Sequence, residues 1–318
     1  MKKLILNSLL CFSFALLSGC GKPSASEDTL TLGVIPKSAG GEFWEEVQSG
    51  AQEAADELGI RIRWEGTVTE TAIAEQNQIM ENMVTMGVKG IALAPLNSKA
   101  LRGQVENAVA AGIPVIVFDS SIEGDRHRAF VATDNRAGGR MAAEKLGSLL
   151  EEGKTRVMAM RFVQGAGSTE ERVAGFSGAA ASLGLEVLAD PYPDTGTIEG
   201  CKTAAANTLE GFIENGKLEL DGIFACNLYS TLGVSAALMD LQNSGVEVQH
   251  VRFVGFDTST ALIRAVEEGR IDALIAQNPK RMGALAVQTL YKVVNGESVP
   301  PVIDTGITIV TQDTLSTP

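Results

Sequence analysis

The hydrophobic pattern alternates between two periods along almost the whole chain. Short runs rich in Val, Ile and Ala are each followed by longer stretches whose apolar residues recur every three or four positions. The short runs are typical of buried strands, and the longer stretches of amphipathic helices. The expected strands are residues 30–35, 60–64, 90–94, 115–118, 129–132, 156–162, 185–189, 222–225, 250–256, 272–276 and 305–310. Their alternation with helices predicts βαβ units and parallel sheets.

Nine helices are expected between these strands. They are residues 42–58, 71–86, 99–111, 136–151, 168–183, 198–215, 231–245, 258–268 and 279–295. Gly59 and Gly87 follow the first two of them, where glycine readily takes the left-handed conformation that ends a helix. The pattern therefore predicts an α/β protein rather than an all-α or all-β one.

The chain also repeats its own plan. GIALAPLNSKAL begins at residue 90 and GIFACNLYSTLG at residue 222. Each is followed by an apolar strand that ends on an aspartate, VIVFDSS with Asp119 and FVGFDTST with Asp257. The repeat predicts two Rossmann-like, doubly wound parallel-sheet lobes. Because no Pro- or Ser-rich linker separates the halves, we expect a multi-strand hinge to join them. The expected lobes are residues 29–133 with 278–304, and residues 134–277 with 305–318.

The first twenty residues are predicted to direct export. Lys2 and Lys3 precede an apolar run over residues 4–17, which is too short to span a bilayer but suits a signal peptide. The run ends in LSGC, which resembles a bacterial lipobox. We expect residues 1–19 to be a lipoprotein signal peptide, Cys20 to carry the lipid and residues 20–28 to form a lipidated tether. The alternative is an ordinary signal peptide that contains a cysteine.

Composition narrows the classes of function. The chain has 318 residues, enough for two packed cores, and a formal net charge of −13, which repels nucleic acid and anionic membranes. Two histidines and no Cys/His cluster give no support to a zinc site, and we expect no metal and no cofactor. Cys201 and Cys226 would share an oxidising compartment, and the sequence leaves open whether they form a disulfide.

Polar residues gather where the expected strands end. In open parallel sheets, ligands bind outside these carboxyl ends. The strand-end residues are Lys37, Asp119, Ser120, Asp134, Asn135, Asn227, Asp257 and Gln277. Carboxylates, amides and a guanidinium such as that of Arg172 suit the hydroxyls of a neutral polyol such as a monosaccharide. Phe43 and Trp44 offer a flat face to a sugar ring, unless they only anchor their helix to the sheet.

Five motifs carry a resemblance to a known family. SAGGEFWEEVQSGA, ATDNRAGG, STEERVAGF, VGFDTS and IDTGITIVT occur in this order. The chain resembles the type I periplasmic sugar-binding proteins of the ribose/galactose type, the substrate-binding lipoproteins of ABC transporters. The resemblance implies carbohydrate transport without catalysis, a small neutral sugar ligand, an ABC transporter permease as partner and a monomer. It also implies an extracytoplasmic location, lipid-anchored to a bacterial membrane, in the periplasm or at the cell surface.

The resemblance also implies roles for individual residues. Those matched to ligand contacts are Phe43, Trp44, Asp119, Asn135, Arg172, Asn227, Asp257 and Gln277, with Lys37, Ser120, Asp134 and Tyr192 as secondary candidates. Gly41, Ala94 and Ser120 depart from the ribose pattern, and Thr195 stands where that pattern has a cleft aromatic, for which Tyr192 is a substitute. These departures leave room for a sugar that is larger than ribose, differently substituted or poorer in hydroxyls.

Two other functions compete with this one. QGAGST at residues 164–169 is a glycine-rich turn of the kind that cradles phosphate, but it lacks the third glycine of a dinucleotide motif and the Gly-Lys-Ser/Thr of a P-loop. An enzyme is therefore disfavoured. IPK at residues 35–37 resembles relatives that bind a furanosyl autoinducer, so a lipid-anchored sensor is the second candidate. The export signal and the lack of a basic headpiece exclude a transcription regulator.

Overall fold

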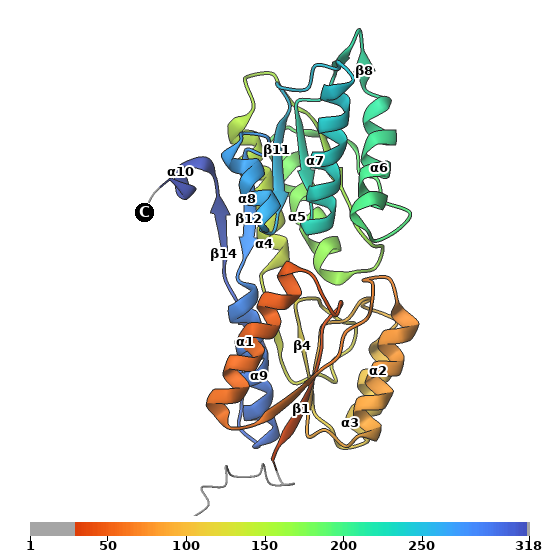
Figure 1. Ribbon diagram of the computed structural model, residues 1–318, viewed down its shortest axis with the longest axis vertical. Coiled ribbons are helices and arrows are strands. Elements are labelled where there is room, and N and C mark those ends of the chain that lie inside the picture. The colour runs from red at the N-terminus through yellow and green to blue at the C-terminus, as the bar shows by residue number, and fades with distance from the viewer. Residues whose placement is uncertain (1–28, 317–318) are drawn as a thin grey trace, which may run out of the picture.

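The computed structural model describes residues 29–316, which form two α/β lobes stacked along the long axis of the molecule (Figure 1). The expected signal peptide, the tether and Cys20 lie outside these residues. Within the described part of the chain, no helix is long and apolar enough to cross a membrane.

The first lobe is built on an all-parallel sheet of six strands. Their order is β13 (Val302–Asp304), β5 (Phe130–Ala132), β4 (Val115–Phe118), β3 (Ile91–Leu93), β1 (Thr31–Ile35) and β2 (Arg61–Trp64). Helices α1 (Glu42–Leu58) and α9 (Pro279–Val294) pack together on one face, and α2 (Ile73–Thr85) and α3 (Arg102–Ala110) cover the other. Because helices cover both faces, a central strand such as β4 is buried at every residue.

The second lobe repeats this plan with one antiparallel edge. The strand order is β14 (Ile307–Val310), β12 (Ala273–Gln277), β11 (Arg252–Phe256), β10 (Gly222–Ala225), β6 (Arg156–Met160) and β7 (Glu186–Ala189), with β14 antiparallel to β12. The helices are α4 (Asn135–Leu149), α5 (Gly167–Ser182), α6 (Ile198–Glu210), α7 (Leu228–Asn243), α8 (Thr260–Glu267) and the short α10 (Gln312–Leu315). The predicted fold class, two lobes with parallel sheets, is confirmed.

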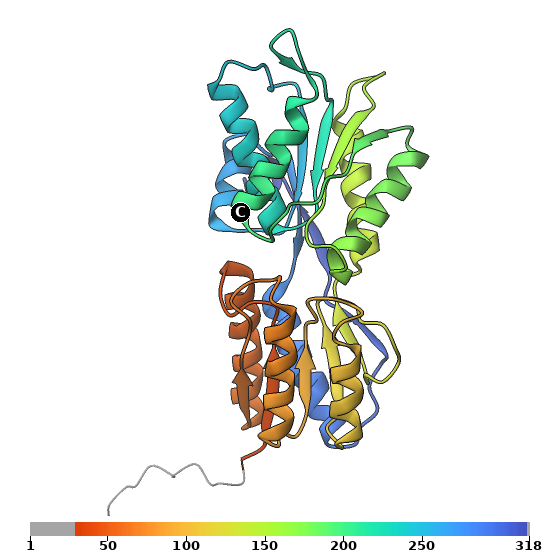
Figure 2. The same cartoon turned by 90° about the vertical axis from the view of Figure 1, so that its right-hand side faces the viewer.

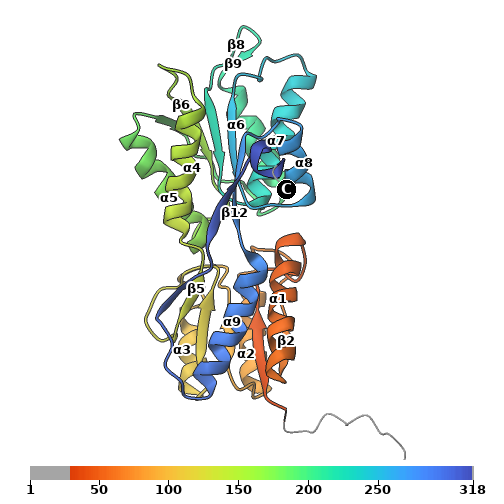
Figure 3. The same ribbon diagram turned by 90° about the vertical axis from the view of Figure 1, so that its left-hand side faces the viewer.

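The chain passes between the lobes three times. It crosses from β5 to α4, from β12 to α9 and from β13 to β14, each time within a few residues (Figures 2 and 3). The three crossings lie together on one side of the molecule (Figure 3). Short parallel connections of this kind form a hinge, and they leave the carboxyl ends of the two sheets facing each other.

The structure differs from the predicted elements at three places, and a turn signal in the sequence accounts for the first of them. The helix expected over 198–215 ends at Glu210, and a hairpin of β8 (Ile213–Glu214) and β9 (Lys217–Leu218) follows. Asn215 and Gly216 both have positive φ, 51° and 77°, so this Asn-Gly pair forms the tight turn that such dipeptides favour. Helix α7 begins at Leu228, before the expected residue 231. Strand β13 was not predicted.

The two thiols of the second lobe are free and buried. Cys201 lies in α6 and Cys226 directly follows β10, and no disulfide joins them. Burial raises the pKa of both thiols to about 12. We expect a chain of residues 29–318 to be inert to Ellman's reagent at pH 8 while folded, because the thiolate is the reactive species. Both thiols should react with the reagent once guanidinium has unfolded the chain. If no thiol reacts after unfolding, the two cysteines form a disulfide instead.

Candidate functional site

The two repeated aspartates occupy equivalent and unusual positions in the two lobes. Asp119 follows β4 and Asp257 follows β11, and each keeps the hydrogen bond from its amide to the neighbouring strand. At each aspartate the backbone adopts the left-handed conformation, with φ of 61° at Asp119 and 69° at Asp257. Residues other than glycine rarely adopt this conformation, and it concentrates at functional sites. The turn ends both strands and sets both carboxylates in the same space.

That space is a pocket between the lobes, with an empty volume of about 420 Å³. The lining residues are Lys37, Gly41, Phe43, Trp44, Glu70, Asp119, Ser168, Thr169, Arg172, Asn227, Leu228, Tyr229, Asp257 and Gln277. Eight of them belong to the predicted set, and they come from both lobes.

In the first lobe, a buried ion pair forms the floor of the pocket. Lys37 Nζ lies 2.6 Å from Asp119 Oδ2, and both side chains are almost fully buried. Lys37 also donates to Ser168 Oγ of the second lobe at 3.0 Å. Ser120 does not line the pocket; its hydroxyl is buried and donates to the same Ser168 at 2.8 Å. Ser120 therefore ties the lobes together behind the pocket.

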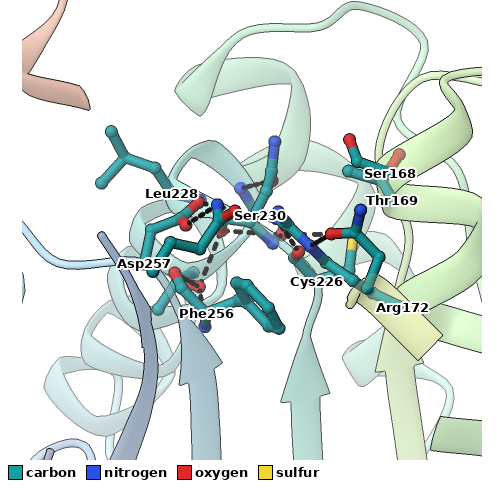
Figure 4. A network of polar contacts seen from close by, with 12 residues as sticks. Ser168, Thr169, Arg172, Cys226, Leu228, Ser230, Phe256 and Asp257 are labelled. Atoms are coloured by element: carbon teal, nitrogen blue, oxygen red, sulfur yellow. Dashed lines mark hydrogen bonds and ion pairs between the residues drawn. The ribbon is translucent and has the colours of Figure 1, made fainter. Parts of the chain in front are cut away.

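In the second lobe, Arg172 is held on several sides (Figure 4). Its Nε donates to Asn135 Oδ1 at 2.9 Å and its Nη1 to the carbonyl of Cys226 at 3.1 Å. The guanidinium lies over the ring of Phe256, 3.8 Å from the centroid. Asn135 is buried and does not line the pocket, so its part is to position the arginine.

Asp257 faces Arg172 across the same wall. Its Oδ1 accepts from Gln277 Nε2 at 2.7 Å, and its Oδ2 accepts from the amide of Leu228 at 2.9 Å and lies 3.8 Å from Arg172 Nη1. Burial raises the pKa of the Asp257 carboxyl, while Arg172 and these hydrogen bonds oppose the rise. The helix that follows is capped by Ser259 instead, so Asp257 does not serve as its cap.

Several polar tips remain for a ligand. Asn227 caps α7 through Oδ1, which leaves its Nδ2 for another acceptor. Gln277 Oε1 is buried and has no hydrogen-bond partner in the described chain. Within residues 29–316, Arg172 Nη2 also donates to no protein group. The pocket thus presents donors and acceptors side by side, as a polyol requires.

The two adjacent aromatics serve both core and pocket. Trp44 is only 3% exposed, and its ring makes edge contacts with Phe43 at 5.0 Å and Phe118 at 6.3 Å. Its Nε1 donates to Glu70 Oε1 at 2.8 Å. Phe43 is half-buried, and both rings line the pocket. Anchoring the helix to the sheet and offering a flat face to a ligand are therefore compatible roles for these two residues.

Two secondary candidates lie away from the pocket. Asp134 caps α4 by accepting from the amide of Ala137. Tyr192 is 38% exposed and donates to Glu170 at 2.7 Å beside Arg161, in a separate surface depression. Tyr192 is only three positions from Thr195 in the sequence, but it does not lie in the cleft. The loop that follows β7 carries it along the outer surface.

The pocket also contains residues that the sequence analysis missed. Ser168 and Thr169 belong to the glycine-rich QGAGST turn, whose pattern points to phosphate rather than to sugar, so a signal was present but indicated another ligand. Tyr229 follows Asn227 by two positions, within the repeated motif. Glu70 lies in the loop before α2, where no periodic pattern could have singled it out.

The lobes touch directly on both sides of the pocket. Glu42 Oε2, at the start of α1, accepts from the amide and hydroxyl of Thr260 at the start of α8, at 2.8 and 3.2 Å. On the other side, the amide of Ser98 donates to the carbonyl of Gly165 at 3.0 Å. These contacts close the cleft around the lining residues.

Comparison with known proteins gives one consistent answer. Residues 32–298 match the sequence profile of the periplasmic binding protein domain. The ribose import binding protein of Bacillus subtilis is 27% identical, over 98% of this chain and all of its own length. A carbohydrate transporter solute-binding protein of Agrobacterium radiobacter, solved with D-arabinose, is 30% identical with a TM-score of 0.84, over 92% of this chain and 98% of its own. A solute-binding protein of Agrobacterium vitis with bound D-fucose is 31% identical with a TM-score of 0.83, over 91% and 97%.

Proposed function

This chain belongs to the periplasmic binding protein family, and from that premise we propose that it captures a neutral monosaccharide between its lobes and delivers it to an ABC importer. The family consists of substrate-binding components rather than enzymes. The proposed lobes are residues 29–133 with 278–304, and residues 134–277 with 305–318.

One observation carries the proposal: each cation of the pocket already faces a carboxylate, and free hydrogen-bonding groups remain. Lys37 pairs with Asp119, and Arg172 faces Asp257. A ligand therefore need not bring charge, whereas it must satisfy Gln277 Oε1 and its neighbours. A ring with several hydroxyls on one side and C–H groups facing Trp44 and Phe43 meets both requirements.

Closure supplies the mechanism. Each lobe contributes some of the polar groups, so a ligand that touches both stabilises the closed arrangement by its difference in affinity for the two states. Closure also removes water from the site. A hydroxyl in the wrong configuration then leaves a buried polar group unpaired, at a cost of about 1–3 kcal/mol, which is roughly 5- to 150-fold in affinity.

Delivery requires a location outside the cytoplasm, near a permease. We propose that Cys20 carries a lipid that holds the mature chain at a bacterial membrane, with the two lobes as a monomer on the tether. Labelling with a radioactive fatty acid should mark the full-length chain and not its Cys20→Ala variant.

A second candidate is a sensor that presents its ligand to a membrane receptor. Its support is Lys37, which lines the pocket and belongs to the IPK segment that resembles autoinducer-binding relatives. Deletion of the gene separates the two: lost uptake of the bound sugar supports import, whereas intact uptake with a lost transcriptional response supports sensing.

The direct test is a thermal-shift screen of a chain of residues 29–318 against neutral monosaccharides. At a ligand concentration 100 times Kd, binding stabilises the folded state by about 2.7 kcal/mol. For a chain of this size we expect the melting temperature to rise by roughly 5 °C with at least one sugar. A flat response to all of them would overturn the proposal.

A further inference from the structure

One corner of the pocket combines a carboxyl group and an aromatic ring from opposite lobes. Glu70 comes from the first lobe, where Trp44 Nε1 donates to one of its two carboxylate oxygens. Tyr229 comes from the first turn of α7, and its ring stacks on Phe162 with centroids 5.5 Å apart and planes 11° from parallel. Both residues line the pocket, and they lie close enough that, after burial, the charge of Glu70 helps to raise the pKa of Tyr229 to about 12. Packing on one side holds each of them and leaves its polar end toward the ligand space.

Tyr229 supplies the cleft aromatic that Thr195 does not. Thr195 is exposed on a loop, where its hydroxyl pairs with Thr197 at 3.1 Å. The Tyr229 hydroxyl instead reaches across to the first lobe, 3.7 Å from where a Cβ at Gly41 would lie. Gly41 has φ of 102°, which favours glycine at this position, and the Tyr229 hydroxyl lies within ordinary contact distance of it. Within the described chain no protein group hydrogen bonds to the Tyr229 hydroxyl, so a ligand can.

The charges of the pocket leave Glu70 as the odd group. Lys37 and Arg172 face Asp119 and Asp257, while Glu70 has only the indole of Trp44 within hydrogen-bond distance. Burial raises the pKa of the Glu70 carboxyl and Lys37 opposes the rise. Each lining cation already faces an acid, so an anionic ligand group would compete with Asp119 or Asp257 for it and would also meet Glu70. This corner can accept a hydrogen bond but cannot neutralise a negative charge.

We infer that Glu70 and Tyr229 form a selectivity corner, which accepts a hydrogen-bond donor of the ligand, a hydroxyl or an amino group, and rejects carboxylates and phosphates. The inference rests on the proposed sugar-binding function and narrows its substrate class. Neutral and amino sugars should bind, whereas uronic acids and sugar phosphates should not.

The test uses a fixed set of probes by calorimetry at pH 7. The neutral probes are D-ribose, D-arabinose, D-fucose, D-glucose and D-galactose; the amino probes are D-glucosamine and D-galactosamine; the anionic probes are D-glucuronate, D-galacturonate and ribose 5-phosphate. We expect the tightest probe to be neutral or cationic and each anion to bind at least roughly 10-fold more weakly, since a like charge faces it. An anion that binds best would overturn the inference.

Two variants locate the effect in the corner. Glu70→Gln should weaken the tightest probe by roughly 10-fold, because a strong acceptor is replaced by an amide. Tyr229→Phe should weaken it by about 5-fold while keeping the ring. A larger loss for an amino sugar than for its neutral parent in Glu70→Gln identifies the donor as ammonium, and equal losses identify a hydroxyl.

Matched controls separate this inference from the proposed function. Glu57→Gln removes an exposed carboxylate from α1, and Tyr291→Phe removes a hydroxyl from α9, both far from the lining residues. Both should bind as the unaltered chain does. If no probe binds the unaltered chain, the proposed function fails and this inference fails with it. If a sugar binds and neither corner variant changes its affinity, only the inference is wrong.

Discussion

Replacement of Arg172 by alanine should abolish ligand binding and weaken the fold at the same time. The side chain is 2% exposed, lies over Phe256 and faces Asp257. Its loss leaves a buried carboxylate without its cation, which typically costs about 3–5 kcal/mol in the free energy of unfolding. We expect the affinity for sugar to fall by more than roughly 100-fold, measured by calorimetry.

Arg172→Lys separates binding from folding. It keeps the positive charge beside Asp257 but loses the fixed geometry that reaches Asn135 and Cys226 together. This variant should remain folded, as measured by circular dichroism. Its affinity for sugar should nevertheless be roughly 10- to 100-fold lower than that of the unaltered chain. Arg140→Ala, on the exposed face of α4, is the control and should change neither quantity. Normal affinity in Arg172→Lys would contradict the assigned role.

A methyl group at Gly139 should destabilise the fold strongly. Helices α4 and α5 cross so closely that a Cβ there would collide with the carbonyl of Arg172, and one at Gly175 would collide with Arg136. Backbone atoms cannot move aside as a flexible side chain can. We expect Gly139→Ala to lower the free energy of unfolding by about 3 kcal/mol, measured by urea denaturation. It should also weaken sugar binding, because it displaces the backbone that carries Arg172.

Gly178→Ala is the matched control on α5. Nothing lies within 4 Å of a Cβ at this exposed position. Alanine favours a helix more than glycine does, so this variant should gain about 0.5–1 kcal/mol. Equal stability of the Gly139 and Gly178 variants would show that the helix crossing adapts without strain.

Local pattern was enough to predict most of the architecture. Strand β4 and helix α1 have the predicted limits, because their periods, Gly59 and the covered sheet faces leave few alternatives. The hairpin at Asn215 was missed although its Asn-Gly signal was present. In that segment, helical periodicity in the residues before it outweighed a two-residue turn signal.

The sequence by itself determined that polar side chains would stand at the carboxyl ends of the strands, because each strand is a short apolar run and Asp119 and Asp257 directly follow one. Only the tertiary structure decided which polar groups meet. It brought Glu70 and Tyr229 to one corner, placed Asn135 behind Arg172 and left Tyr192 outside. The physical reason is that a strand's end is set by its own residues, whereas a pocket wall depends on how loops and helices from two lobes pack across a hinge.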